Sequence, residues 1–243
     1  MENLIKGKNI LLTGATGGIG KVIAKSLALE GANLILFAGR NQESLLSLKN
    51  EILQLGVKCE CYPFELTNVD KLDEMLLKVK ETFDSIDVLI NNAGVAQNTP
   101  FDQISVEEFD KIFNLNVKAP YFLTQKVLPD LINNKGTIIN VASVVGHLGY
   151  ENQNTYTASK HALIGFSKSL ATEIFKKGVR VHVISPGGVM TDMIKLTRPD
   201  LAGQPMINPI DIAQTIIFLL NFRNNSVIDE IVIHREGKEP FLV

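Results

Sequence analysis

A cluster of glycines between an apolar run and a helical pattern, near the N-terminus, restricts the possible folds more than any other feature. Residues 10–20 read ILLTGATGGIG, and KVIAKSLALEG follows with apolar residues at helical spacing. Glycine lets the backbone turn tightly and approach a ligand, and the first amides of the helix then stabilise a pyrophosphate. A strand, a glycine turn and a helix in this order predict a dinucleotide site at residues 13–20.

The rest of the chain continues the alternation of apolar runs and helical patterns. Continuous apolar runs such as GTIINV and VRVHVI favour a parallel sheet that is covered on both faces. The length of 243 residues, with 45% hydrophobic and 21% charged, fits one domain with a sizeable core. We therefore expect a single α/β domain over residues 1–243, a Rossmann-type doubly wound parallel sheet of about seven strands with helices on both faces. The expected strands are 8–13, 33–38, 57–62, 86–90, 136–141, 179–185 and 227–233.

Composition and charge argue against several other classes of protein. A formal net charge of -2 without a long single-sign run gives no footprint for nucleic acid or an anionic membrane. The longest apolar stretches, such as TIIFLL, are too short to cross a bilayer. Cys59 and Cys61 alternate along an expected strand, which favours buried thiols over a disulfide or a metal site. We expect a soluble cytoplasmic protein with no metal, no nucleic acid and no membrane partner.

Three groups suited to proton transfer occur in one short stretch. Tyr156 and Lys160 are four residues apart in TYTASK, and Ser143 precedes them in INVASVVG. On a helix this spacing brings the ammonium close to the phenol. Lowering a phenol pKa from about 10 to about 7 takes about 4 kcal/mol, and a cation about 4 Å away at an effective dielectric of about 20 supplies that much. The alternative is a chance pair on an amphipathic helix, where tyrosine packs and lysine is solvated.

A second candidate segment follows the apolar run IDVLI and reads NNAG, residues 91–94. Small residues at the carboxyl end of a buried strand are where an open α/β sheet receives its ligand. An Asn-rich turn is the alternative for this tetrapeptide when it is considered alone.

Taken in order, TGATGGIG, NNAG, Asn116 in FNLNVKAP, Ser143, the Tyr156–Lys160 pair and SPGGVMTDM resemble the short-chain dehydrogenase/reductase family over nearly the whole chain. The resemblance implies an NAD(P)-dependent oxidoreductase. It implies that Tyr156 is the general acid in carbonyl reduction and the general base in oxidation, and that Ser143 holds the substrate oxygen. Lys160 would lower the tyrosine pKa and bind the nicotinamide ribose, and Asn116 would hold a water that links Lys160 to solvent.

The family resemblance also implies a set of cofactor contacts. Arg40 follows the second strand in LILFAGRNQ, where no acidic residue is present, so NADP(H) is favoured, with NAD(H) as the alternative. Glu65 stands where the family usually carries Asp beside the adenine. The expected contacts are Gly14, Thr16, Gly18, Ile19, Gly20, Arg40, Glu65, Leu66, Asn92, Ala93, Gly94, Tyr156, Lys160, Pro186, Gly187, Val189 and Thr191.

The substrate is only partly indicated. SVVG, Gln153 and the loop length resemble 3-oxoacyl-acyl-carrier-protein reductases, but Asn134 replaces a frequent arginine and the C-terminal segment lacks their glycine pair. We expect NADPH-dependent reduction of a 3-oxoacyl or other ketone, with acyl carrier protein not favoured as a partner. Oxidation of a sugar alcohol, hydroxy acid or steroid is one alternative. A non-catalytic dinucleotide sensor is the other, and the presence of Ser143, Tyr156 and Lys160 argues against it.

Two further expectations concern a flap and an interface. Residues 190–209 contain prolines and a glycine just after the cofactor segment, which favours a mobile flap over the substrate, with a plain surface loop as the alternative. The helix after Lys160 and the preceding helix, APYFLTQKVLPDLI, carry more apolar residues than one sheet contact needs. In relatives these two helices pair across a two-fold axis, so a homodimer or homotetramer is expected, unless both helices are simply core.

Overall fold

A parallel β-sheet forms the centre of the molecule. The structure, a computed structural model, describes residues 3–39, 41–201 and 203–238. Within this part of the chain, seven strands pair in the order β3-β2-β1-β4-β5-β6-β7, all parallel. The order reverses direction between β1 and β4, so the predicted doubly wound sheet is confirmed. The strands are β1 (Asn9–Thr13), β2 (Asn33–Ala38), β3 (Cys59–Pro63), β4 (Val88–Asn91), β5 (Thr137–Val141), β6 (Arg180–Pro186) and β7 (Glu230–Ile233).

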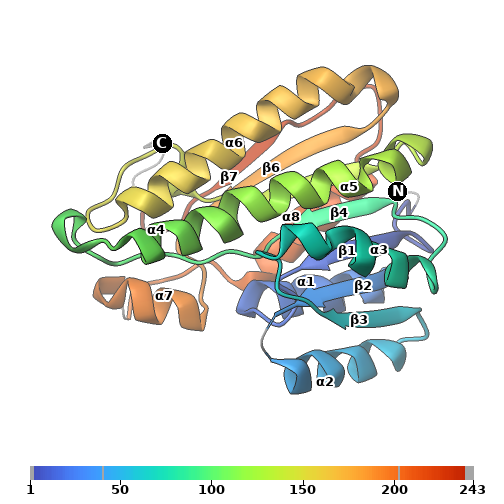
Figure 1. The fold of residues 1–243 in the computed structure, drawn as a ribbon, viewed down its shortest axis with the longest axis horizontal. Helices are drawn as coiled ribbons and strands as arrows, with labels where there is room; N and C mark the ends of the chain where they lie inside the picture. Colours follow the sequence, from blue (N-terminus) through green and yellow to red (C-terminus); the bar gives the residue numbers. More distant parts are fainter. Residues whose placement is uncertain (1–2, 40, 202, 239–243) are drawn as a thin grey trace.

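Helices cover both faces of the sheet (Figure 1). Buried residues of α1, α2 and α8 form one core with the sheet, and those of α3, α5 and α6 form the other. The helices are α1 (Gly18–Leu29), α2 (Gln42–Leu53), α3 (Leu72–Lys80), α4 (Val106–Phe113), α5 (Ala119–Asn133), α6 (Asn154–Ile174), α7 (Asp192–Thr197) and α8 (Pro209–Asn221). The short helical turns are η1 (Val69–Lys71), η2 (Phe101–Gln103), η3 (Asn114–Lys118), η4 (Val144–Gly146), η5 (Phe175–Lys177) and η6 (Pro199–Leu201), of which η3 is a π-helical turn.

Burial on both faces explains the continuous apolar character of the strands. In β1, Ile10 and Leu12 pack into the core with α1 and α8, whereas Leu11 packs into the core with α3 and α5. All five residues of β5 are buried. Each predicted strand is present, and no boundary differs from its prediction by more than three residues.

The parallel arrangement brings the carboxyl ends of the strands to one edge of the sheet, where ligands bind in such folds. The segment after β6 is closed at its base: Val189 and Ile207 form a bridge, in which the Met190 amide donates to the Ile207 carbonyl at 2.9 Å. The excursion between them contains α7 and η6 and lies beside that edge (Figure 1). The predicted flap, residues 190–209, includes this excursion together with Ile207 and the first residue of α8, and its role as a flap stays a prediction.

Neither a membrane-spanning helix nor a cluster of metal ligands is present in the described ranges. No helix there combines the length and the apolar character that a membrane crossing requires. Nor do three His, Cys, Asp or Glu side chains of these ranges gather as ligands of a metal ion would.

Candidate active site

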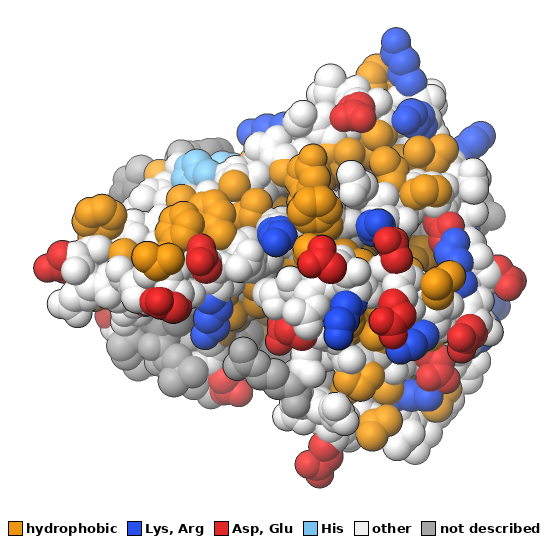
Figure 2. Space-filling model, in the orientation of Figure 1, with side chains coloured by type: hydrophobic (Ala, Val, Ile, Leu, Met, Phe, Trp, Pro, Cys, Tyr) orange, Lys and Arg blue, Asp and Glu red, His pale blue; other side chains and the backbone are white. Residues whose placement is uncertain are grey.

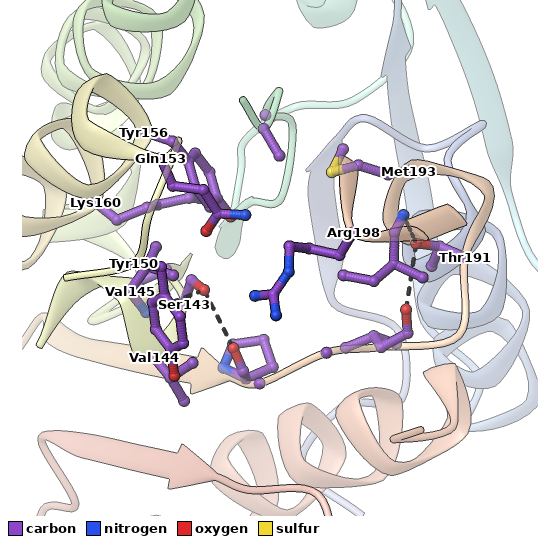
Figure 3. A pocket seen from close by; sticks show the side chains of 18 of the residues that line it. Ser143, Val144, Val145, Tyr150, Gln153, Tyr156, Lys160, Thr191, Met193 and Arg198 are labelled. Carbon is purple, nitrogen blue, oxygen red and sulfur yellow. Dashed lines mark hydrogen bonds between the residues drawn. The ribbon is translucent and has the colours of Figure 1, made fainter. Parts of the chain in front are cut away.

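Ser143, Tyr156 and Lys160 line one cavity of about 380 Å³ at the carboxyl edge of the sheet. The three come from two elements: Ser143 follows β5, and the other two lie in the first turns of α6. Figure 3 shows their side chains on one side of the cavity, with Thr191 and Met193 on the other. The structure therefore brings together at one cavity the three groups that the sequence analysis expected to act together.

Backbone contacts fix the position of Ser143. Its hydroxyl donates to the carbonyl oxygen of Pro186 at 3.3 Å and accepts from the Val145 amide at 3.3 Å. Ser143 also begins the turn η4, which starts one residue later. The hydroxyl thus lies between β5 and the end of β6, at the wall of the cavity.

Tyr156 and Lys160 differ from the expectation in their electrostatics. Burial raises the pKa of the Tyr156 phenol, and the hydrogen bond with Ser143 only partly opposes this. Burial also lowers the pKa of Lys160 to about 8. The Lys160 ammonium lies 5.8 Å from the centre of the Tyr156 ring and donates to the Val141 carbonyl at 2.9 Å. Burial is the main cause of the raised pKa and Lys160 is not among its causes, so the expected lowering of the tyrosine pKa by Lys160 is not seen in this structure.

Asn116 lies in the π-helical turn between α4 and α5 and is buried. Its amide accepts from the Val95 N–H at 2.9 Å and donates to the Val95 carbonyl at 2.9 Å. It also donates to the Ser159 hydroxyl at 3.1 Å. A side chain at Gly94 would come within 3.2 Å of Asn116 Oδ1 and 3.6 Å of Lys160 Nζ. Gly94 therefore keeps a space open between the two predicted residues.

The glycine turn has little room for side chains. Gly14 has a φ of +66°, and a Cβ there would lie 2.8 Å from the Ala93 Cα. A Cβ on Gly20 would lie 2.1 Å from the Gly14 carbonyl oxygen, and one on Gly18 would lie 2.8 Å from Thr191 Cγ2. Glycine is required at these positions because the turn, the NNAG segment and Thr191 approach one another closely.

The first turn of α1 is open to a ligand. Gly17 is its N-cap and provides no side-chain hydrogen bond to the first amides. An anion is stabilised at such a helix N-terminus. The first amides of α1 thus have no side-chain partner from the N-cap, and the pyrophosphate site at this turn stays a prediction.

Thr13, which belongs to the predicted dinucleotide site but not to the expected cofactor contacts, connects NNAG to the glycine turn through hydrogen bonds. The Thr13 hydroxyl accepts from the amides of Asn92 and Ala93, both at 3.0 Å. The Asn92 side chain donates back to the Thr13 carbonyl at 3.0 Å. Thr13 ends β1 as the first letter of TGATGGIG, so its place in the motif was the available signal.

Of the other predicted cofactor residues, some line the cavity and some do not. Leu66 is buried in the core, so that only its backbone is available to a ligand. Glu65 accepts from the Thr67 hydroxyl at 3.2 Å and lies close to Gly39, at the end of β2. Thr16 is half-buried in the glycine turn, and Arg40 is outside the described residues. Those that line the same cavity as Tyr156 are Ile19, Asn92, Gly94, Lys160, Pro186, Gly187, Val189 and Thr191.

Gln97 is a positioning residue that the sequence analysis missed. It is 1% exposed, and its Oε1 accepts from the amides of Thr155 at 2.9 Å and Tyr156 at 3.1 Å. Gln153, the N-cap of α6, makes no such hydrogen bond with its own side chain. The cap of the catalytic helix is therefore supplied by the segment after NNAG. No local sequence signal could indicate this, because Gln97 lies far from Tyr156 in the chain.

His147 takes part in a polar cluster with residues of β6 and β7. Its Nε2 lies 2.7 Å from Glu230 Oε1 and 3.3 Å from Ser185 Oγ, and the Ser185 hydroxyl donates to Glu230 at 2.9 Å. This cluster fastens the segment that carries Ser143 to the last two strands.

Comparison with known proteins points in the same direction as the geometry. The family model described as short chain dehydrogenase matches residues 8–202. The 3-oxoacyl-(acyl-carrier-protein) reductase FabG of Thermotoga maritima is 34% identical over 94% of this chain and 96% of its own length. A metagenomic short-chain oxidoreductase in complex with NADP has a TM-score of 0.83 and 31% identity, covering 97% of this chain and all of its own. A dehydrogenase/reductase from Sinorhizobium meliloti has a TM-score of 0.87 and 28% identity, with 96% of each chain covered.

Proposed function

Because this chain belongs to the short-chain dehydrogenase family and is an oxidoreductase, we propose that it reduces a ketone to an alcohol with NADPH. One observation carries this proposal: the half-buried Tyr156 lines one cavity with Ser143 and Lys160, so that its phenol and the Ser143 hydroxyl face the same space. A protonated phenol beside a hydroxyl suits the donation of a proton to a carbonyl oxygen.

The chain's own residues would divide the work as follows. The Ser143 hydroxyl, which already lies at the cavity wall, would donate to the carbonyl oxygen and hold it near Tyr156. Tyr156 would transfer its proton to that oxygen, and the charge left on the phenolate would be stabilised by the buried Lys160 ammonium. Asn116 would hold the backbone of the segment after NNAG through its two contacts with Val95. The bound nicotinamide supplies the hydride.

The choice of NADP(H) rests on two grounds. The relative of known structure mentioned above was determined in complex with NADP. In addition, Arg40 follows β2 in the sequence where an acidic residue would favour NAD. A charge-assisted hydrogen bond to the 2′-phosphate is worth about 1.5 to 3 kcal/mol. Titration of Arg40→Ala with both cofactors should therefore show a loss for NADPH and little change for NADH.

A panel of ketones and alcohols, assayed with NADPH, NADH and their oxidised forms, tests the proposal. We expect turnover of at least one ketone with NADPH, at a kcat/KM above that with NADH. Turnover confined to alcohols, or a preference for NADH throughout, would contradict the proposed direction or cofactor. Binding of a dinucleotide without turnover of any compound would indicate a sensor.

We further infer a homo-oligomer built from α5 and α6. Tyr121 on α5 is 45% exposed and packs against Phe166 on α6, with ring centres 4.9 Å apart. Figure 2 shows hydrophobic side chains gathered on the face formed by α4, α5 and α6. Such a face suits an isologous contact with a second copy. Light scattering at micromolar concentration should give a dimer or tetramer, and a fully active monomer would contradict the inference.

The excursion of residues 190–209 would act as the flap over the substrate within a single catalytic domain. Support comes from its base, closed by the Val189–Ile207 bridge, and from Thr191, Met193 and Arg198, which line the cavity. Cleavage of this segment by a protease should slow when cofactor and substrate are bound, if it closes over them.

A further inference from the structure

The cavity has an unequal distribution of charge. Its lining contains the basic residues Lys160, Arg198, Arg235 and Lys238, and among the described residues that line it there is no Asp or Glu. The whole chain, in contrast, has a formal net charge of -2. A cavity lined by one sign of charge concentrates ligands of the opposite sign.

Two of these cations, Arg198 and Lys238, lie over the Tyr150 ring, and Arg235 belongs to the same cavity lining. Arg198 lies 5.6 Å from the centre of the Tyr150 ring, and Lys238 lies 5.9 Å from it. Tyr150 belongs to the loop between Ser143 and Tyr156, so it is near the reacting groups rather than near α1. Figure 3 shows the Arg198 side chain extending into the cavity towards the segment with Ser143 and Tyr150. We call Arg198, Arg235 and Lys238 the basic rim.

The carboxylate of Asp200 forms an ion pair with the basic rim. Asp200 accepts two hydrogen bonds from Arg198, at 2.8 and 2.6 Å. Its side chain is 57% exposed, whereas that of Arg198 is 25% exposed. Solvent therefore screens the carboxylate more than it screens the guanidinium, and the rim keeps a net positive field towards the cavity.

The hydrogen-bond partners of Arg235 are uncharged, although the Asp200 carboxylate also interacts with it electrostatically. Its guanidinium donates to Gln204 Oε1 at 2.9 Å and lies 3.7 Å from the sulfur of Met206, both uncharged groups in the segment after η6. Arg235 itself follows β7. The rim is thus assembled from two segments, the excursion after β6 and the chain after β7, which tertiary structure brings together over the cavity.

We propose that the substrate is an anionic ketone, whose carboxylate or phosphate group binds the basic rim while its carbonyl lies against Ser143 and Tyr156. This inference rests on the proposed ketone reduction and adds the chemical class of the substrate. Arginine and lysine provide charge-assisted hydrogen bonds to either kind of anion, so the two sources are separated by experiment.

Matched pairs of ketones test the charge directly. At saturating NADPH, 4-oxopentanoate is compared with its methyl ester, and dihydroxyacetone phosphate with dihydroxyacetone. We expect kcat/KM for the charged member of at least one pair to exceed that of its neutral partner by more than about tenfold, as one charge-assisted contact implies. Raising the salt concentration should reduce this ratio, because added ions screen the rim. The pair with the larger ratio identifies the anion as carboxylate or phosphate.

Single substitutions in the basic rim test whether it causes the difference in kcat/KM between charged and neutral ketones. Arg198→Gln, Arg235→Gln and Lys238→Met should each lower the charged-to-neutral ratio, by about tenfold for the best placed of them. Lys177→Met, which removes an exposed lysine of η5 outside the cavity, is the matched control and should leave the ratio unchanged. Because Lys238 is exposed, its variant should fold even if an arginine variant does not.

Several results would overturn the inference. Neutral members that are reduced as well as the charged ones would show that the rim does not select anions, although ketone reduction would still stand. If the variants raise KM for NADPH but leave the charged-to-neutral ratio of kcat/KM unchanged, the three cations bind the cofactor and not the substrate. If no ketone of any charge is reduced with either cofactor, the proposed function fails, and this inference fails with it.

Discussion

Two regions meet at the cavity, the turn between β1 and α1 and the cluster at the start of α6, and they are built in different ways. The turn consists of backbone with almost no side chains, since Gly14 and Gly20 have no space for a Cβ. The cluster consists of polar side chains: Lys160 and Asn116 are buried and hydrogen-bonded, and Tyr156 is half-buried. The turn should therefore be sensitive to added atoms, and the cluster to removed atoms.

The largest expected effect comes from removing one atom in the cluster. Tyr156→Phe deletes the proton donor and keeps the ring, so kcat should fall by about 10²- to 10⁴-fold. Binding of NADPH, measured by fluorescence titration, should remain close to wild type. Tyr62→Phe is the control, because Tyr62 lies on β3 outside the cavity. Near-normal turnover by Tyr156→Phe would show that another group donates the proton.

Adding one methyl group should disturb the turn strongly. In Gly14→Ala, a residue with a side chain would have to adopt a φ of +66°, and its Cβ would lie 2.8 Å from the Ala93 Cα. Both effects destabilise the folded state. We expect a loss of about 3 to 4 kcal/mol in the free energy of unfolding, from backbone strain and overpacking, and weaker binding of NADPH. Gly56→Ala is a matched control, since Gly56 has a φ of +79° with no atom within 4 Å of a Cβ. Equal losses in the two variants would show that close packing contributes nothing.

The buried ammonium of Lys160 should make stability depend on pH. Burial lowers its pKa from 10.5 to about 8, so between these values only the unfolded chain carries the proton. The contribution of this group to stability therefore rises with pH in that window and is constant below it. Lys160→Met lacks this titration, so its stability relative to wild type should decline by up to about 3 kcal/mol as the pH rises through the window. Urea unfolding from pH 7 to 10 measures this, and parallel curves for the two proteins would contradict it.

The smallest expected effect concerns the cap of α6. Gln97→Met removes the oxygen that accepts from the Thr155 and Tyr156 amides, which should cost about 1 to 2 kcal/mol of stability. We expect kcat to fall by about three- to tenfold through the altered position of Tyr156, with KM for NADPH unchanged. Gln97→Glu keeps an acceptor and should restore most of the thermal stability. A kcat equal to that of wild type in Gln97→Met would limit Gln97 to a structural role.

The fold and the cofactor turn could be predicted because their signals are local. A strand buried on both faces must be apolar along its length, as β5 is, and a tight turn must contain glycine where a Cβ has no space, as at Gly20. The spacing of Tyr156 and Lys160 predicted their neighbourhood for the same reason, since one helix determines it. These features depend on the order of neighbouring residues, and the sequence states that order directly.

Tertiary structure alone decided the environment of these groups. Burial raises the pKa of Tyr156, whereas a pair considered in isolation suggested the opposite, because desolvation depends on everything that surrounds the phenol. The cap supplied by Gln97 and the basic rim around Tyr150 join segments far apart in the chain. Sequence by itself therefore determined the order of the elements and the candidates for the reacting groups, and the folded chain determined the burial of these groups and the charge that lines the cavity.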